Sequence, residues 1–302
     1  MTEVERIIKE GVIPVDFLKP EVRCDFLVDT DRKKIWAVCL DMLIKFDAIC
    51  KKHNLKYYVI AGTLLGTIRH KGFIPWDDDI DVGMMREDYD RFNQIAREEL
   101  SHPYFWQTHN TDKGSLYSYN KIRNSNTSAI SKTFRFAGFN QGIWLTIFPL
   151  DNWPLEGGEE RYNAIKKLNQ ENSAHMRRSN PHPTEADLER LAQFPYRDPN
   201  IVVNEINTIC TQYNGQPCEY IKAASATVIK YPKGIYNKSD FASSLLLDFE
   251  GLLKVPVPVG YDNILTRVYG NYMEFPPIEE RGKWHDGTIF NADKPYSEYE
   301  FD

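Results

Sequence analysis

The sequence is poor in cysteine, and the cysteines it has are not arranged for a metal site or a disulfide framework. Only five cysteines occur among 302 residues, and no two of them form a Cys-x-x-Cys pair. An odd and scattered set of this kind does not build a disulfide scaffold or a structural zinc site. Free thiols are typical of a reducing compartment. We therefore expect a cytoplasmic protein.

Two further absences restrict the partners. The chain has no run of about 18 apolar residues, so no transmembrane helix is predicted. The segment 1–14 is charged and lacks the apolar run of a signal peptide. The formal net charge of −6 argues against nucleic-acid binding, which requires a basic face. A partner linked to the membrane would therefore be reached by peripheral contact at the inner face of the membrane.

What the chain does contain is typical of a globular protein with a large core. Hydrophobic residues make up 42% and charged residues 26% of it, and this length supports a core without disulfides or a structural metal. Helical and extended patterns alternate, which indicates an α+β fold with a mixed β-sheet flanked by helices. We expect helices over 31–53, 64–70, 86–100 and 261–269, and strands over 56–60, 79–84, 104–108, 116–123, 127–130 and 142–148, the last ended by Pro149.

The pattern also divides the chain into four parts. We expect an N-terminal helical segment (1–54) packed on the core, the core itself (55–155), a helical insertion (156–215) and a C-terminal part (216–302) that completes the core. The insertion is predicted because residues 159–213 are polar and helical in pattern. The tail from Trp284 onward is polar, and we expect it to be poorly ordered.

The most informative segment gathers four acids in five positions, at Asp77, Asp78, Asp79 and Asp81. Such side chains repel each other unless a cation or bulk water relieves the charge. The alternation around Ile80 is a strand pattern that puts Asp79 and Asp81 on one face, about 7 Å apart. Two such carboxylates can bind Mg²⁺ or Mn²⁺, which orient phosphates for transfer. Asp77 and Asp78 are expected to lie in a solvated loop or behind the ligands.

A second element precedes these acids. Gly62 and Thr63 follow a predicted strand and precede a predicted helix, where free backbone N–H groups suit a phosphate. The Thr63 hydroxyl can cap the helix or contact the phosphate, and both alternatives fit. Arg69, one or two helical turns later, is predicted to bind phosphate. The alternative is that it is one of the basic residues that stabilise the C-terminal end of a helix by interacting with the helix dipole.

Two cations alternate on a later strand. Lys121 and Arg123 lie on the same face of the strand expected over 116–123. Like charges side by side are unfavourable unless an anion is near. We therefore predict that both residues bind substrate.

The run from Ala61 to Asp81 resembles the LicD family, which includes bacterial phosphocholine transferases and resembles fukutin-related proteins. Other segments are similar to motifs of that family, and together they extend the resemblance over about Leu55 to His285, with the helical middle unmatched. These segments are 121–127 (KIRNSNT), 142–151 (GIWLTIFPLD), 255–258 (VPVP) and 269–277 (YGNYMEFPP).

The resemblance implies a nucleotidyltransferase-like core and a transferase that needs Mg²⁺ or Mn²⁺. Its typical reaction moves a phosphorylated alcohol, usually phosphocholine from CDP-choline, to a cell-surface glycan such as teichoic acid or lipopolysaccharide. On this basis Asp79 and Asp81 are catalytic and hold the metal, and Gly62 and Thr63 lie at the phosphates. Asp151, at the end of the matched strand, joins the predicted substrate-binding residues.

One position departs from the family pattern. Thr146 stands where the family strand carries a third acid, and a threonine neither takes a proton at neutral pH nor binds metal well. The two aspartates suffice if Asp151 or Glu250 acts as base. Otherwise the enzyme is slow or uses another acceptor, or the chain is a catalytically impaired nucleotide- or glycan-binding homologue. A nucleotidyltransferase that moves the nucleotide itself also fits the core motif.

Overall fold

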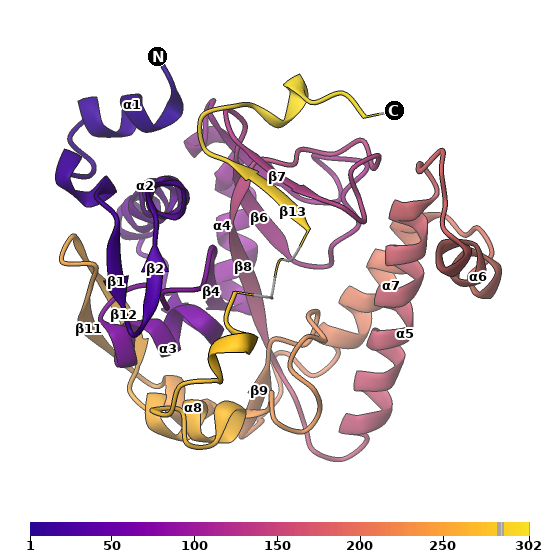
Figure 1. The fold of residues 1–302 in the computed structure, drawn as a ribbon. Helices are drawn as coiled ribbons and strands as arrows, with labels where there is room; N and C mark the ends of the chain where they lie inside the picture. Colours follow the sequence, from indigo (N-terminus) through magenta and orange to yellow (C-terminus); the bar gives the residue numbers. More distant parts are fainter. Residues whose placement is uncertain (283–284, 286, 302) are drawn as a thin grey trace.

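The computed structural model describes residues 1–282, 285 and 287–301, and in these residues the chain forms a mixed sheet flanked by helices (Figure 1). The predicted α+β class is confirmed. The main sheet runs in the order β10-β9-β8-β4-β3, and β6 pairs with both β8 and β5. Its strands are β3 (Tyr58–Val59), β4 (Ile80–Met85), β5 (Tyr104–Gln107), β6 (Asn120–Asn124), β8 (Ile143–Asn152), β9 (Tyr220–Lys222) and β10 (Tyr236–Asn237).

Strand β8 is the centre of this sheet. It pairs in parallel with β4 and antiparallel with β6 and β9. The expectation that Pro149 ends the strand is wrong, because β8 continues to Asn152 and Pro149 stands opposite Met84 in the ladder. A proline usually avoids a central strand because it cannot donate a ladder hydrogen bond. Here the long apolar run on both sides outweighs that loss.

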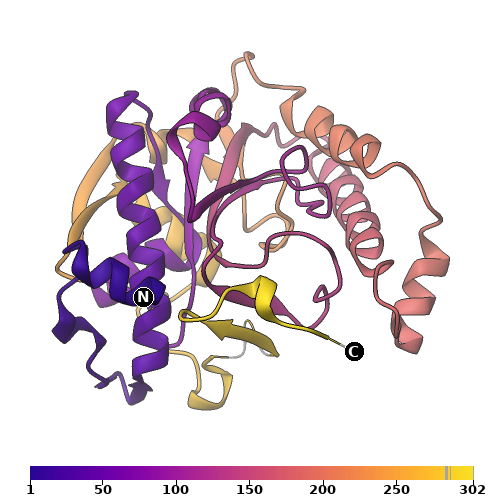
Figure 2. The same ribbon diagram turned by 90° about the horizontal axis from the view of Figure 1, so that it is seen from above.

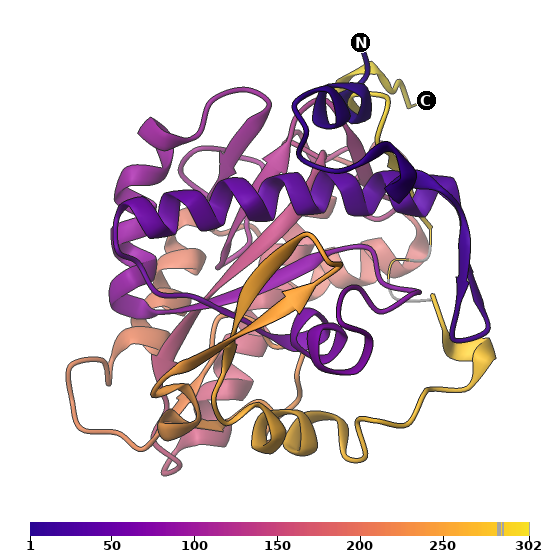
Figure 3. The ribbon, with the colours of Figure 1, turned by 90° about the vertical axis from the view of Figure 1, so that its left-hand side faces the viewer.

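Two long helices cover one face of the sheet. Helix α2 (Thr30–Lys52) begins after Asp29, whose side chain accepts a hydrogen bond from the Arg32 N–H, and α4 (Arg86–Glu99) follows β4 directly. Their aromatic side chains meet edge to face where Phe46 and Phe92 lie 5.0 Å apart. Ile80 and Leu145 of the sheet are fully buried in the same core. Figure 3 shows α2 running across this side of the molecule.

The polar middle of the sequence forms three helices on the other side of the molecule, at the right of Figure 1 and in Figure 2. They are α5 (Gly158–Arg177), α6 (Glu185–Gln193) and α7 (Pro199–Thr211). Ile165 and Ile206 are fully buried there in a small cluster of their own around Trp153. The structure thus has the helical insertion that the pattern indicated. The division into four parts with the stated boundaries stays a prediction.

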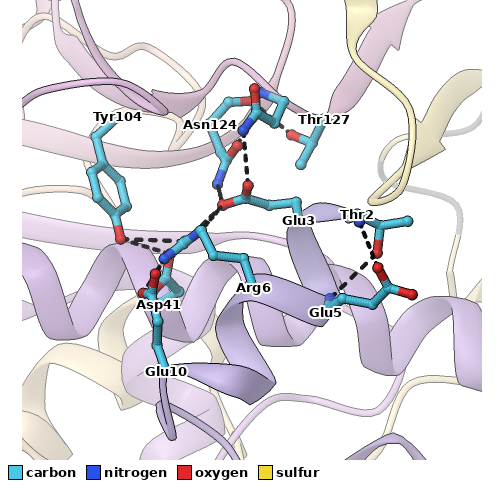
Figure 4. Close-up of polar contacts among 10 residues, drawn as sticks. Thr2, Glu3, Glu5, Arg6, Glu10, Asp41, Tyr104, Asn124 and Thr127 are labelled. Atoms are coloured by element: carbon cyan, nitrogen blue, oxygen red, sulfur yellow. Dashed lines mark hydrogen bonds and ion pairs between the residues drawn. The ribbon is translucent and has the colours of Figure 1, made fainter.

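The N-terminal helix α1 (Glu3–Lys9) is tied to the core by buried polar contacts (Figure 4). The Arg6 guanidinium donates to Asp41 of α2 at 2.7 Å, and Asn124 at the end of β6 donates to Glu3 at 2.7 Å. Because buried charges are costly unless paired, these contacts fix the position of α1. They also hold the turn after β6 in place.

Two short hairpins and the C-terminal segment complete the chain. The expectation of a poorly ordered tail is wrong for the described residues, because β13 pairs antiparallel with β7; Trp284 itself lies outside them.

Among the described residues, no helix combines the length and the apolar character that crossing a membrane requires. The remaining elements are β1 (Glu21–Arg23), β2 (Phe26–Val28), α3 (Ala61–His70), β7 (Ser128–Ser131), β11 (Ser244–Phe249), β12 (Leu253–Pro258), α8 (Tyr261–Tyr269), β13 (Thr288–Asn291) and the short 3-10 helices Val15–Leu18, Lys238–Phe241, Ile278–Glu280 and Tyr296–Glu298.

Candidate active site

The predicted glycine turn lies at the start of α3. This helix begins at Ala61, so Gly62 and Thr63 are in its first turn and not before it. The Thr63 hydroxyl accepts a hydrogen bond from the backbone N–H of Asp81 at 2.8 Å. It therefore joins the helix to β4, a role that neither of the two predicted alternatives included.

Gly62 faces a carboxylate. A Cβ atom on Gly62 would come within 2.7 Å of Asp77 Oδ2, which is closer than real Cβ contacts. Only glycine lets the backbone approach the side chain so closely. The turn and the acidic segment are therefore packed directly against each other, as their spacing in the sequence suggested.

Three carboxylates form what we call the aspartate group, namely Asp77, Asp79 and Asp81. The backbone carbonyl of Asp77 is held by α2, because it accepts from the Trp36 indole at 2.8 Å and from the Arg32 guanidinium at 3.0 Å. Burial and the neighbouring carboxylates raise the pKa of Asp77 and Asp81 well above their usual range, and burial raises the pKa of Asp79. Asp77 is half-buried in the loop that leads into β4, close enough to Asp79 and Asp81 for the charges to act on one another. Its expected place behind the metal ligands stays a prediction.

The fourth acid has a partner that the sequence did not reveal. His285 Nδ1 pairs with Asp78 Oδ1, and His285 Nε2 lies 3.9 Å from Asp79 Oδ2. Burial opposes the charged imidazole, but the Asp78 hydrogen bond and the charges of Asp78, Asp79 and Asp77 raise the pKa of His285 to about 9. No local pattern marks this histidine. The one feature of the sequence that could have drawn attention to His285 is that the family resemblance extends as far as this residue.

The departure at Thr146 sits beside the aspartate group. The register places Thr146 opposite Asp81 on one side and opposite Lys121 on the other, with Gln107 next in the row. Thr146 is buried, and its hydrogen bond favours the charged form of Asp81. A carboxylate at this position would therefore point to the same face as Asp81. That Thr146 stands where the family carries a third acid stays a prediction.

Lys121 is enclosed by aromatic rings. Its ammonium lies 4.4 Å from the centre of the Tyr117 ring and 4.6 Å from that of Trp144. Burial and the charge of Arg123 lower the pKa of Lys121 well below its usual range, although Asp79 and Asp81 act in the opposite direction. Within the described residues this ammonium makes no salt bridge. Its hydrogen-bonding capacity remains available to an anionic ligand.

Two other predicted phosphate ligands are already engaged by the protein. Arg123 is buried and donates to Gln107 Oε1 and to the Gly142 carbonyl, both at 2.8 Å. Arg69 donates to the carbonyls of Tyr272 and Glu274, both at 2.8 Å. In this structure Arg123 supports the sheet face and Arg69 anchors the C-terminal segment. A direct role in substrate binding stays a prediction for both.

Asp151 lies apart from the aspartate group. It is five residues after Thr146 on β8, and this odd spacing puts it on the opposite face of the strand. Both of its carboxylate oxygens accept from Arg86, at 2.8 and 2.7 Å, and one also accepts from Asn214. The structure therefore does not bring Asp151 to the site.

Glu250, the other carboxylate considered as a base, is also engaged. Both of its oxygens accept from Arg23, at 2.7 and 2.8 Å, and one also accepts from the Phe73 N–H. This ion pair joins the β1–β2 hairpin to the turn between β11 and β12. Glu250 is therefore a structural residue in this arrangement.

The metal-binding capacity of the site rests on the aspartate group. In the part of the chain that the structure describes, no three His, Cys, Asp or Glu side chains stand together in an arrangement that would hold a metal ion. The carboxylates of Asp79 and Asp81 nevertheless supply the hard oxygen donors that Mg²⁺ and Mn²⁺ prefer. Metal binding at these residues stays a prediction.

Comparison with known proteins gives the same family as the motifs. Residues 54–154 match the family described as LicD/FKTN/FKRP, nucleotidyltransferase domain. The chain is 29% identical over 254 residues to the lipopolysaccharide cholinephosphotransferase LicD of Haemophilus influenzae, a match that covers 82% of this chain and 93% of that protein. An uncharacterized protein of Rickettsia typhi is 57% identical over 44 residues, which are 15% of this chain and 14% of that protein. The resemblance predicted from the motifs is confirmed.

Proposed function

Because residues 54–154 belong to the LicD family of nucleotidyltransferase domains, we propose that this chain transfers phosphocholine from CDP-choline to a hydroxyl group of a cell-surface glycan, with Mg²⁺ or Mn²⁺ at Asp79 and Asp81. The observation that carries the proposal is the aspartate group, whose half-buried carboxylates concentrate negative charge beside the first turn of α3. The similarity to a lipopolysaccharide cholinephosphotransferase supports phosphocholine as the group transferred.

Asp79 and Asp81 offer oxygen donors to a divalent cation, although no three His, Cys, Asp or Glu side chains among the described residues are already arranged around a metal position. Asp77, Asp79 and Asp81 have raised pKa values because burial and mutual repulsion oppose their charged forms. A bound cation removes both penalties, and His285 supplies only one positive charge, directed mainly at Asp78. When bound, the metal would neutralise phosphate charge and stabilise the leaving group.

The phosphates of the donor would lie between α3 and β6. The N-terminus of α3 offers the partial positive charge and free N–H groups of a helix start. Lys121 faces the same side of the sheet and makes no salt bridge among the described residues. We assign the donor diphosphate to Gly62, Thr63 and Lys121.

The reaction balances with these parts. An oxygen of the acceptor hydroxyl forms a bond to the phosphorus of the phosphocholine group, and the bond from that phosphorus to the bridging oxygen breaks. CMP leaves with the bridging oxygen, and the hydroxyl proton goes to a base. Since Asp151 and Glu250 are each paired with an arginine, we place the base within the aspartate group. Positioning and charge stabilisation supply the rest of the acceleration.

Thr146 favours a second candidate function. Because it occupies the position of the expected third acid, opposite Asp81, the chain could bind a nucleotide or glycan without turning it over. The core motif alone also fits transfer of the nucleotide from a nucleoside triphosphate, in which case diphosphate and not CMP would leave.

One experiment separates these functions. The purified chain is incubated with CDP-choline or, in a parallel reaction, with CTP, each with Mg²⁺ or Mn²⁺ and with and without lipopolysaccharide or teichoic acid. CMP is quantified in the first reaction and diphosphate in the second. Release of CMP that depends on metal and acceptor supports the phosphocholine transferase. Calorimetric binding of CDP with Mg²⁺ but no CMP release supports the impaired homologue, and diphosphate release supports the nucleotidyltransferase. Absence of both binding and release overturns the proposal.

A further inference from the structure

A pocket of about 510 Å³ lies between the segment after β7 and the C-terminal segment after β13. Figure 2 shows the C-terminal segment next to the loops that follow β7. The aromatic walls include Phe105, Phe136, Phe139, Tyr299 and Phe301. This volume is in the range of small-molecule sites. None of the residues assigned to the donor lines it.

The pocket has few polar groups, and some of them can still form hydrogen bonds. The Gln141 Nε2 donates to the carbonyls of Phe134 and Arg135, which fixes the amide orientation. Gln141 is buried, and its Oε1 has no hydrogen-bond partner within the described residues. Such a group calls for a ligand or a water. Asp112 accepts at Oδ2 from Gln107 and the Asn140 N–H, which leaves Oδ1 as a further acceptor.

This combination suits a neutral, hydroxylated ring better than a cation. Arg135 also lines the pocket, and its guanidinium lies 4.8 Å from the centre of the Phe136 ring and 5.6 Å from that of Phe301. Since a cation already occupies these ring faces, a second cation such as choline would be repelled. A sugar offers hydroxyl donors to Gln141 and Asp112 and an apolar face to the rings.

The pocket and the aspartate group lie on the same face of the sheet. Phe105 stands opposite Arg123 on β6, and Arg123 stands opposite Trp144 on β8. From β5 to β4 this row spans three strand spacings, roughly 14 Å. Phe139 is a shared wall, because it lines the pocket and lies 6.2 Å, ring centre to ring centre, from Tyr117 beside Lys121. A chain of sugars could occupy both places at once.

We propose that this pocket is an acceptor subsite that binds a sugar unit of the glycan at a distance from the hydroxyl that receives the phosphocholine. The inference rests on the proposed transferase function for its role, but the binding of a sugar in the pocket can be measured separately. The acceptor glycan must then contain more than one sugar, because a single ring cannot fill the pocket and reach the aspartate group at the same time.

The test uses the full chain and saturation-transfer NMR with the methyl glycosides of glucose, galactose, N-acetylglucosamine and N-acetylgalactosamine. We expect at least one glycoside to receive saturation, and Tyr299→Ala with Phe301→Ala to reduce that signal at least fivefold. Tyr196→Ala, an exposed tyrosine on the helical insertion, is the matched control and should leave it unchanged. Neither CDP-choline nor tetramethylammonium chloride should displace the sugar.

Three results would overturn the inference: no glycoside receives saturation, the signal survives the double substitution, or tetramethylammonium displaces the sugar. CMP release is measured on the same proteins. If the sugar binds as expected but no CMP is released, the subsite proposal stands and the transferase proposal is wrong. If CMP is released but the saturation signal survives the double substitution, the transferase proposal stands and the subsite proposal is wrong.

Discussion

Gly62 and Asp77 are packed so closely that the carboxylate Oδ2 would lie 2.7 Å from a Cβ atom at position 62. The contact joins the first turn of α3 to the acidic segment that enters β4. It explains why a glycine stands in a helix, where alanine would be more favourable by about 1 kcal/mol. The backbone at this position is shaped for the carboxylate next to it.

Gly62→Ala should therefore lower CMP release without unfolding the protein. The added methyl group forces the Asp77 carboxylate to move, and misplacement by about 1 Å can cost on the order of 100-fold in rate. The thermal unfolding midpoint should stay level or rise, because alanine favours the helix. Steady-state CMP release and a melting curve check both. Wild-type turnover in this variant would show that the position of Asp77 does not matter.

Asp79→Asn and Asp81→Asn should each abolish metal-dependent CDP binding and CMP release. Each removes one carboxylate of the proposed metal site, and the metal-free fold should be retained because the repulsion among the remaining carboxylates is smaller. Calorimetry with CDP and Mg²⁺ measures the binding. Asp16→Asn, at an exposed position paired with Lys19, is the matched control. If either variant keeps full activity, the site is elsewhere.

Thr146→Asp should raise CMP release at saturating Mg²⁺ by on the order of tenfold or more. The new carboxylate would stand between Asp81 and Lys121. Without metal it adds to the buried negative charge, so the unfolding midpoint should fall and recover when Mg²⁺ is added. Thr146→Asn has a similar shape without charge and should show neither effect. Equal rates for the Asp and Asn variants would contradict the assignment of this position.

Arg69→Ala should loosen the C-terminal segment more than it weakens donor binding. The guanidinium holds the carbonyls of Tyr272 and Glu274, so hydrogen–deuterium exchange over residues 270–281 should become faster. The KM for CDP-choline should change less than about twofold if Arg69 only anchors, since uniform binding is then intact. Arg97→Ala, an exposed arginine of α4, is the control. A large rise in KM without faster exchange would instead support the phosphate contact predicted from the sequence.

His70→Gln should reduce the sensitivity of the fold to acid. Burial, with the charges of Arg69 and Arg23, lowers the pKa of His70 to about 4, and the ring stacks on Phe275 at 5.6 Å. Between about pH 6.5 and 4 the unfolded chain binds a proton that the folded chain does not, so folding stability falls as the pH drops. Urea unfolding at pH 7.5 and 5 should show a smaller loss for the variant. An equal loss would mean that His70 is not the group responsible.

The local parts of the site could be read from the sequence because their signals are local. The alternation at Asp79 and Asp81, the nearby glycine turn and the position of Thr146 all depend on spacing within one or two elements. Helix α2 and the course of β4 were predicted for the same reason. The start of α3 lies three residues earlier than predicted, at Ala61, whose backbone is left-handed (φ 49°).

The rest depends on contacts between distant segments, which no periodicity encodes. Asp77 stands beside Asp79 and Asp81 because α2 holds its carbonyl, and His285 reaches Asp78 across 207 residues. Glu250 looked available until the fold paired it with Arg23. Each of these outcomes is decided by tertiary packing, which commonly overrides local preference.

The pairing of β13 with β7 has a consequence for synthesis. Both His285 and Phe290, which stacks on Trp144 at 5.8 Å, are added long after the strands they cover. During translation, β4, β6 and β8 can associate while the acidic side of the sheet still lacks this cover. The ribosome must pass residue 291 before that cover can form. Premature termination upstream of β13 would therefore release a chain in which this face of the sheet is exposed.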